Sequence, residues 1–355
     1  MIDNYGDLGV CGRLAQGLAD RGQQVRLWVD DEALAARMAP QWCGVQVQAW
    51  PTDQGAAAEP PEPGDVVIEA FGCDPPVGFV QTMAQRSRAP VWINLEYLSA
   101  EPYVRRSHGL RSPQSSGPGA GLDKWFFFPG FTPGTGGLLR EAGLIERREA
   151  FKREDWLQGW GVGAGAKRRV VSLFAYPHAP LEPFLDALVQ DGAAAPLVVM
   201  AAAGPLQDRA RRWAAAQAPS TSVQVVELPW LTQADFDHLL WSCDLNLVRG
   251  EDSLVRALWA GRPFLWHIYP QHDGVHEVKL RAFWETLAQG SMPAHWFSWS
   301  QAWNGLGPWP SSAPSLWELA AQLQRPAAIW SQTLAAQPDL VEALLSFVAA
   351  RQATD

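Results

Sequence analysis

The alternation of short apolar segments with helix-length stretches in the second half of the chain constrains the fold more than any other feature. From Arg169 onward, segments of strand length are followed in turn by stretches whose apolar residues recur at helical spacing. Strands that alternate with helices form a parallel sheet with helices on both of its faces. The expected strands are VVSLF, LVVMAA, VQVVEL, LNLV and PFLW, and the helices are expected at residues 184–189, 206–213, 233–243, 253–260 and 278–287.

The first half carries the same pattern more weakly. Residues 25–29 (VRLWV) alternate like a strand, and residues 66–68 and 91–93 are short apolar runs bounded by Gly, Asp or Pro. Ahead of them, residues 9–20 form an amphipathic helical pattern that ends at Gly22. This spacing is that of a second βαβ region.

A chain of 355 residues suits two domains of about 150 to 180 residues each. We expect residues 1–155 to form an amino-terminal Rossmann-like domain, residues 156–330 to form a carboxyl-terminal one, and a helix in residues 331–355 to pack back on the first domain. Two such α/β domains facing a central cleft are the architecture of GT-B glycosyltransferases. Open α/β sheets bind ligands beyond the carboxyl ends of their strands, so the functional residues are expected at strand-to-helix junctions.

Composition excludes several classes of protein. A net charge of −9 argues against non-specific nucleic-acid binding, which depends on clustered Lys and Arg. No apolar run approaches the roughly 18 residues of a membrane span, and the beginning of the sequence shows no export signal, so no membrane partner and a cytoplasmic location are expected. The four cysteines form no CxxC pair, which disfavours disulfides and zinc.

The first junction, residues 3–10 (DNYGDLGV), brings two carboxylates to the start of a helix. Its glycine spacing differs from the GxGxxG fingerprint of dinucleotide-binding proteins. Asp7 at a helix start is equally what a simple helix cap requires, so both interpretations stay open. Asp3 precedes the turn, where no cap is needed.

The second junction, residues 247–254 (LVRGEDSL), passes from an apolar strand into a helix through Arg249, Glu251, Asp252 and Ser253. Backbone N–H groups at the helix start, with Arg249 and the Ser253 hydroxyl, could bind a diphosphate. Glu251 could bind sugar hydroxyls. A helix cap would explain Asp252 or Ser253 alone but not the whole set, and we therefore favour a functional site.

A third junction places Phe174 and Tyr176 at the end of the strand VVSLF. Side chains two residues apart share one face of a strand, so this pair could bracket a nucleobase, although aromatic residues at strand ends are more often part of the core. His272 and His276 have a ligand-like spacing, but Gly274 disfavours a helix and no third ligand is evident. No metal site is predicted.

Several motifs together resemble a known family. The chain is similar to the EarP family, the bacterial protein-arginine rhamnosyltransferases, along both halves, and the combination of RGEDS with the motif that follows it is highly specific. The motifs are DNYGDLGV, INLEYLSAEPYV, KWFFFPGFTPGTGGLLRE, VSLFAY, LWSCDLNLVRGEDSLVRALWAGRPFLWHIYPQ and HEVKL.

The resemblance implies a function and a set of roles. It implies an inverting transfer of rhamnose from dTDP-β-L-rhamnose to an arginine side chain of translation elongation factor P, without a metal ion or other cofactor. Motif by motif, Asp7 matches the proposed general base, Asp3 a second required acid, and Glu251 an essential glutamate. The donor-binding positions are matched by Asp252 and Ser253 at the diphosphate and by Phe174, Tyr176 and Gln233 around the thymine and deoxyribose.

Two other functions compete with this one. The first is a GT-B enzyme with another acceptor such as lipopolysaccharide, which usually carries a basic or apolar membrane-facing patch that this acidic chain lacks. The second is a non-catalytic nucleotide-sugar-binding module, which would not need acids at both Asp3/Asp7 and Glu251.

The chain departs from the family in three respects. Only Met1 and Ile2 precede DNYGD, where family members have an apolar strand, so we expect the first strand to be missing and a start roughly ten residues upstream. Residues 51–64 form a proline-rich loop, and His178 and His272 stand where other residues are expected.

Overall fold

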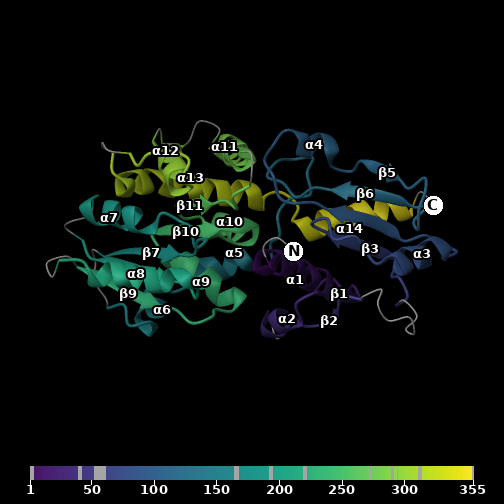
Figure 1. The fold of residues 1–355 in the computed structure, drawn as a ribbon, viewed down its shortest axis with the longest axis horizontal. Helices are drawn as coiled ribbons and strands as arrows, with labels where there is room; N and C mark the ends of the chain where they lie inside the picture. Colours follow the sequence, from purple (N-terminus) through teal and green to yellow (C-terminus); the bar gives the residue numbers. More distant parts are fainter. Residues whose placement is uncertain are drawn as a thin grey trace. The chain divides into compact units, whose positions relative to one another are not determined.

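The chain forms two compact units (Figure 1). The computed structural model describes residues 4–38, 42–51, 61–163, 168–191, 195–218, 222–271, 274–288, 292–293, 295–310 and 314–353. The first unit is Met1–Glu141 with Ala335–Asp355, and the second is Ala142–Leu334.

The division between the units falls before helix α5 (Leu144–Ala150), not near residue 155. Arg148 holds α5 to the second unit, because its guanidinium donates to the Trp259 carbonyl at 2.6 Å and to the Ser331 hydroxyl at 2.9 Å. Helix α6 (Arg153–Gly159) is held in the same way, since Arg153 Nε donates to the Ser242 carbonyl at 2.6 Å. These polar contacts between residues far apart in sequence leave no mark on the local sequence pattern.

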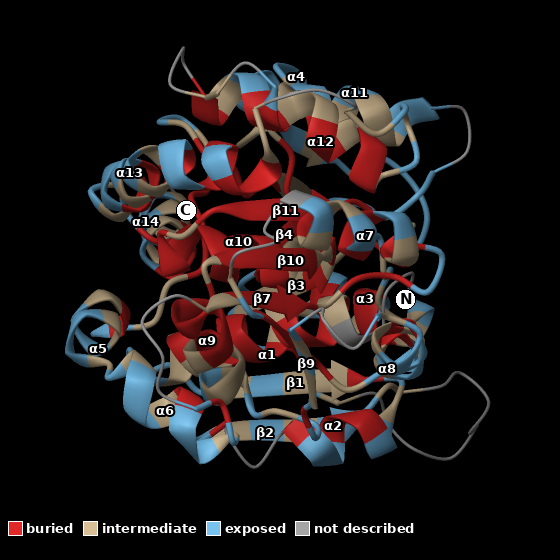
Figure 2. Ribbon diagram, turned by 90° about the vertical axis from the view of Figure 1, so that its left-hand side faces the viewer, coloured by how far each residue is buried: buried red, intermediate tan, exposed pale blue. Residues whose placement is uncertain are grey.

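The second unit is a five-stranded parallel sheet in the order β11-β10-β7-β8-β9. Every expected strand is present, which confirms the α/β prediction. Four of the strands are almost entirely buried, whereas β9 at the edge of the sheet has no buried residue (Figure 2). The strands are β7 (Arg169–Leu173), β8 (Leu197–Ala201), β9 (Val223–Glu227), β10 (Leu245–Arg249) and β11 (Phe264–His267).

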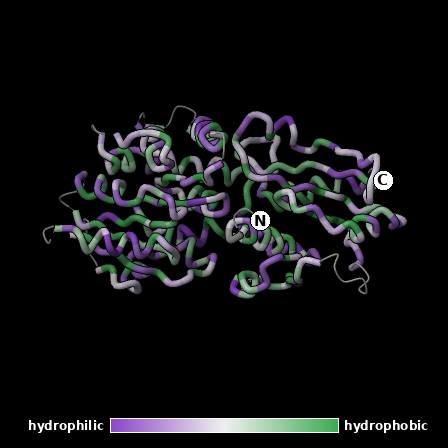
Figure 3. Tube along the Cα trace, in the orientation of Figure 1, coloured by the Kyte–Doolittle hydropathy of each residue, from purple (hydrophilic) through white to green (hydrophobic). Residues whose placement is uncertain are grey.

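Helices cover this sheet and alternate with it along the chain (Figure 1). Hydrophobic and hydrophilic stretches alternate correspondingly along the trace in Figure 3. The chain runs from β7 outward to β8 and β9, then returns to place β10 on the other side of β7. The carboxyl ends of β7 and β10 therefore flank the topological switch point, where open α/β sheets bind ligands. The helices after β7 are α7 (Leu181–Asp191), α8 (Pro205–Ala215), α9 (Gln233–Ser242), α10 (Gly250–Ala260), α11 (Val275–Ala288), α12 (Trp296–Trp303) and α13 (Leu316–Ala335).

The first unit has two separate sheets among its described residues. Strands β1 (Val25–Val29) and β2 (Val45–Ala49) form a parallel pair. A four-stranded sheet has the order β3-β4-β6-β5, in which only β5 is antiparallel. Its strands are β3 (Val66–Ala70), β4 (Val91–Leu95), β5 (Arg111–Pro113) and β6 (Asp123–Phe127). The helices of this unit that precede α5 are α1 (Asn4–Ala19), α2 (Glu32–Met38), α3 (Val77–Gln85) and α4 (Tyr103–Ser107).

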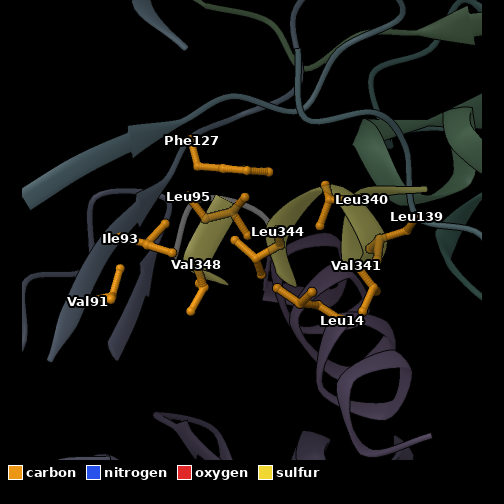
Figure 4. Close-up of a cluster of buried hydrophobic side chains, with 10 residues drawn as sticks. All are labelled: Leu14, Val91, Ile93, Leu95, Phe127, Leu139, Leu340, Val341, Leu344 and Val348. Atoms are coloured by element: carbon orange, nitrogen blue, oxygen red, sulfur yellow. The ribbon is translucent and has the colours of Figure 1, made fainter. Parts of the chain in front are cut away.

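Helix α14 (Leu340–Gln352) completes the core of the first unit. Figure 4 shows its apolar side chains lying with Leu14 of α1 and with residues of β4. Leu344 is 1% exposed, and Asp339 caps the helix by accepting from two backbone N–H groups. The last helix of the chain thus packs with elements from its first half.

A cavity of about 630 Å³ lies in the first unit between β1 and β3. It is lined by all five residues of each strand and by Asp7, Leu8 and Cys11 of α1. The first strand was expected to be missing ahead of α1. Residues 1–3, which precede α1, lie outside the described residues.

One helical stretch, Leu316–Gln352, is long and apolar enough to cross a membrane by length and composition alone. It consists of α13 and α14, which are separated around Pro338. Both helices bury apolar side chains within the units to which they belong, and this explains their hydropathy without a membrane.

Candidate active site

The switch point of the second unit carries an arginine between two aromatic rings. Arg249 ends β10, and its guanidinium carbon lies 4.5 Å from the ring centre of Phe174 and 5.0 Å from that of Tyr176. Phe174 and Tyr176 follow β7, the strand that pairs with β10. The structure thus brings together three of the predicted donor-binding residues. A cation held against aromatic faces suits a ligand with both an anionic group and a planar ring.

A buried histidine fixes the backbone beneath this cradle. His267 ends β11, and its Nδ1 accepts a hydrogen bond from the Tyr176 backbone N–H at 3.1 Å. Burial, with the nearby His178 and Arg249, lowers the pKa of His267 to about 3, so the ring is neutral and remains an acceptor. Tyr269 follows β11 and meets Tyr176 edge to face at 5.4 Å between ring centres. Neither His267 nor Tyr269 was among the predicted site residues.

Helix α10 begins at Gly250, three residues earlier than expected, so Glu251 to Ser253 form its first turn. Gly250 has φ +62°, a left-handed conformation that permits the sharp change from strand to helix. The Ser253 hydroxyl closes this turn, because it accepts from the Arg249 N–H at 2.9 Å and donates to the Arg249 carbonyl. Trp266 Nε1 donates to the Gly250 carbonyl at 2.8 Å, which fixes the turn from the neighbouring strand.

The predicted glutamate is held by a lysine from another helix. Glu251 Oε1 lies 2.9 Å from Lys279 Nζ of α11, and both side chains are less than one fifth exposed. Lys279 lies in the HEVKL motif, but nothing in the sequence connects it with Glu251. The ion pair therefore brings a cation from α11 to the first turn of α10.

Gln233 is the first residue of α9, and Phe236, one turn later, packs edge to face on Phe174 at 5.3 Å. The start of α9 is thus close to the aromatic cradle. A buried ion pair ties α9 to α10, since Arg256 Nε and Nη2 bind the two carboxylate oxygens of Asp237 at 2.7 and 2.5 Å. Both helices that carry predicted donor-binding residues are thereby fixed to each other.

In the first unit, Asp7 lies in the first turn of α1 and is 6% exposed. The helix begins at Asn4, ahead of the helical pattern expected from residue 9, so Asp7 lies within the helix. Asp7 lines the cavity together with Cys11, one turn later. Burial and then the charge of Asp7 raise the pKa of Cys11 to about 12, so this thiol stays protonated. Asp3 lies outside the described residues.

Three carboxylates act on one thiol beyond the carboxyl ends of β1 and β3. The pKa of Cys73 is raised first by burial and then by the negative charges of Asp30, Asp7 and Asp74. Asp30 directly follows β1, and Asp74 follows β3. These ends of the strands therefore carry a negative field of the kind that attracts a cation such as guanidinium. Asp30 and Asp74 were not predicted as site residues.

A further acid lies within β3 itself. Glu69 binds Lys124 Nζ at 2.6 Å and accepts from Trp92 Nε1 at 3.0 Å, while Lys124 also lies 4.2 Å from the centre of the Trp92 ring. Burial raises the pKa of Glu69, although its hydrogen bond with Lys124 acts in the opposite direction. The charged residue inside the apolar run VVIEA is a signal for Glu69 alone, and nothing in the sequence indicates its partner Lys124.

Two units of Rossmann type, with a cationic and aromatic cradle at the switch point of the second, define a GT-B glycosyltransferase. The model of the family described as Elongation-Factor P (EF-P) rhamnosyltransferase EarP matches residues 1–349. The chain belongs to the EarP family, and it is an enzyme.

Individual proteins agree with this placement. A protein-arginine rhamnosyltransferase of Pseudomonas putida is 43% identical over 98% of this chain and 96% of its own length. A solved structure described as the basis for EarP-mediated arginine glycosylation of translation elongation factor EF-P is 32% identical, covers 98% of this chain and 95% of that one, and has a TM-score of 0.62. MurG of Acinetobacter baumannii is 14% identical over 97% of this chain and 96% of its own, with a TM-score of 0.50, and shares the fold alone.

Proposed function

We propose that this protein transfers rhamnose from dTDP-β-L-rhamnose to an arginine side chain of translation elongation factor P, with inversion at the anomeric carbon. The single observation that carries the donor assignment is the placement of Arg249 against Phe174 and Tyr176 at the switch point, beside the first turn of α10. Since the acceptor is a translation factor, the proposed location is the cytoplasm.

In this proposal the aromatic cradle holds the nucleotide. Thymine packs against Phe174 or Tyr176, and Gln233 at the start of α9 binds the base or deoxyribose through its amide. Arg249 faces the diphosphate as a bidentate donor. The Ser253 hydroxyl is hydrogen-bonded to the backbone of Arg249. Ser253 and Asp252 are therefore proposed to bind the diphosphate through their backbone N–H groups at the helix start.

The chemical step requires a base that acts on the acceptor and positive groups that stabilise the leaving dTDP. A guanidinium has a pKa above about 12 and is a poor nucleophile because its lone pairs are delocalised. Asp7, with Asp3 as the second acid, orients the acceptor guanidinium and accepts a proton as the new C–N bond forms. The departing dTDP gains negative charge, which Arg249 and the first turn of α10 stabilise in place of a divalent metal. Attack and departure on opposite faces of the sugar give inversion.

Intact-mass analysis of elongation factor P tests this function. The acceptor is incubated with the protein and dTDP-β-L-rhamnose, and a mass gain of one deoxyhexose is expected, unchanged by EDTA. An acceptor whose modified arginine is replaced by lysine is the matched control and should gain no mass. Transfer only from a different nucleotide sugar would overturn the donor assignment. Loss of transfer on chelation, with recovery in Mg²⁺ or Mn²⁺, would overturn the metal-free stabilisation of the leaving group.

A further inference from the structure

The turn that follows β3 holds a bulky residue in a strained backbone conformation. Phe71 has φ +58°, and among the described residues it is the one non-glycine residue with a positive φ. Gly72 follows at φ +73°, and the Cys73 N–H donates to the Ala70 carbonyl at 3.1 Å, so the turn has two central residues of positive φ, as in type I′. Such turns favour Gly, Asn or Asp, because a large side chain is strained in this region. Strain of this kind is concentrated at functional sites.

The strained turn places the Phe71 ring on a second aromatic ring. Phe71 and Tyr97 stack with their ring centres 4.6 Å apart and their planes 24° apart. The Phe71 N–H donates to the Leu95 carbonyl at 3.0 Å, which attaches the turn to the end of β4, and Tyr97 lies two residues beyond that end. Both rings are partly exposed. The stack therefore lies beyond the carboxyl ends of β3 and β4, the edge at which open α/β sheets bind ligands.

Carboxylates accompany the two rings. Glu96 lies between β4 and Tyr97, and its Oε1 accepts from Asn94 Nδ2 at 2.9 Å. Burial raises the pKa of Glu96, although hydrogen bonds from Asn94 and from the Tyr97 N–H act in the opposite direction. A cation beside Glu96 would favour its ionised form. Asp7, the proposed base, lines the same cavity as Phe71. Aromatic faces and carboxylates together suit a cationic ligand and disfavour an anionic one.

We propose that the Phe71–Tyr97 stack and Glu96, together called the acceptor platform, bind the guanidinium of the acceptor arginine beside Asp7. A guanidinium is planar, so it packs flat on an aromatic ring while its N–H groups donate to a carboxylate in the same plane. The platform thereby selects arginine over lysine, because an ammonium group has no plane to stack. It also accounts for the strained turn, which puts the Phe71 ring in place. This inference rests on the proposed function and names the residues that hold its acceptor.

Binding of two acceptors to the full chain tests the platform. Elongation factor P and its variant with lysine in place of the modified arginine are compared by calorimetry. The parent protein should bind the arginine form about fivefold or more tightly than the lysine form. Phe71→Leu, Tyr97→Ala and Glu96→Gln should each reduce this preference to less than about twofold. Tyr97→Phe keeps the ring, is the matched control and should retain the preference.

Kinetics separate this role from a structural one. In Phe71→Leu the KM for the arginine acceptor should rise about five- to tenfold, while kcat changes by no more than about threefold and the affinity for dTDP by no more than about twofold. Phe71→Gly suits the positive φ and removes the ring without straining the turn, so it should show the same loss.

The outcomes distinguish the platform from the reaction it serves. An unchanged preference for arginine in Phe71→Leu, Phe71→Gly and Tyr97→Ala would overturn the platform, and rhamnose transfer by the parent would then leave the proposed function intact. A parent protein that transfers no rhamnose would overturn the proposed function. Its preference for the arginine form, if lost with the rings, would still support the platform.

Discussion

Asp7 is the residue on which the proposed chemistry depends most. It is buried at the start of α1, and its charge contributes to the raised pKa of both Cys11 and Cys73. Asp7→Asn should lower the transfer rate by about 10²- to 10⁴-fold, since an amide cannot accept the proton. Affinity for the dTDP-sugar, measured by calorimetry, should stay within about twofold, because the proposed base acts on the acceptor and not on the donor. Near-normal turnover of this variant would remove Asp7 from the mechanism.

Lys279 is expected to act through Glu251 as a positioning residue. If the ion pair orients the Glu251 carboxylate, Lys279→Met and Glu251→Gln should each weaken donor binding, and the double variant should be little worse than either single one. A double-mutant cycle should give a coupling free energy of about 1 to 3 kcal/mol. Arg281→Met changes the exposed pair with Glu277 on the same helix and is the matched control. Simple additivity of the two changes would show that the pair does not act as a unit.

His267 makes the stability of the second unit depend on pH. Its pKa of about 3 in the folded protein lies below the ordinary value of 6.5, so the unfolded chain binds the proton more readily. The stability contributed by the neutral ring is therefore complete above pH 6.5 and is lost as pH falls toward 3. At pH 5 the loss is roughly 2 kcal/mol. Urea unfolding at pH 7 and pH 5 should show that His267→Gln loses less stability on acidification than the parent protein; equal losses would contradict this.

At the level of helices and strands, the alternation in the second half predicted every strand of that sheet, because period and length are local properties of sequence. The beginnings of α1 and α10 were predicted too late. Glycines in DNYGDLG and RGEDS favour loops locally, but Gly250 in fact permits the turn and Gly6 and Gly9 lie inside α1. The pairs Glu69–Lys124 and Glu251–Lys279 join residues far apart in sequence, and a single sequence carries no signal of such contacts.

Helix α14 should be essential to the stability of the first unit. Leu344 is buried among residues of α1, β4 and β6, so Leu344→Ala should destabilise the protein by about 2 to 5 kcal/mol. Ser346 is exposed on the same helix, and Ser346→Ala should change stability by no more than about 0.5 kcal/mol. Thermal unfolding followed by circular dichroism provides the comparison. Equal melting temperatures for the two variants would mean that α14 is only loosely attached.

At the level of the whole molecule, the two units differ in how the chain builds them. The second is one continuous stretch, Ala142–Leu334, whereas the first needs Ala335–Asp355 as well. A fragment of residues 142–334 should fold alone and give a dispersed amide NMR spectrum. Residues 1–141 should stay poorly folded until residues 335–355 are attached through a short linker. A folded 1–141 fragment would show that α14 is dispensable.

This discontinuity has a consequence for synthesis on the ribosome. Domains generally fold as units while the chain emerges from its amino end. Here the half that is made first lacks its closing helix until residues 335–355 have been translated, so the second unit folds before it. Until then, the surface of β4 and α1 that α14 later covers is open to chaperones and proteases. A chain released early by a premature stop would keep a complete second unit and be degraded from its first.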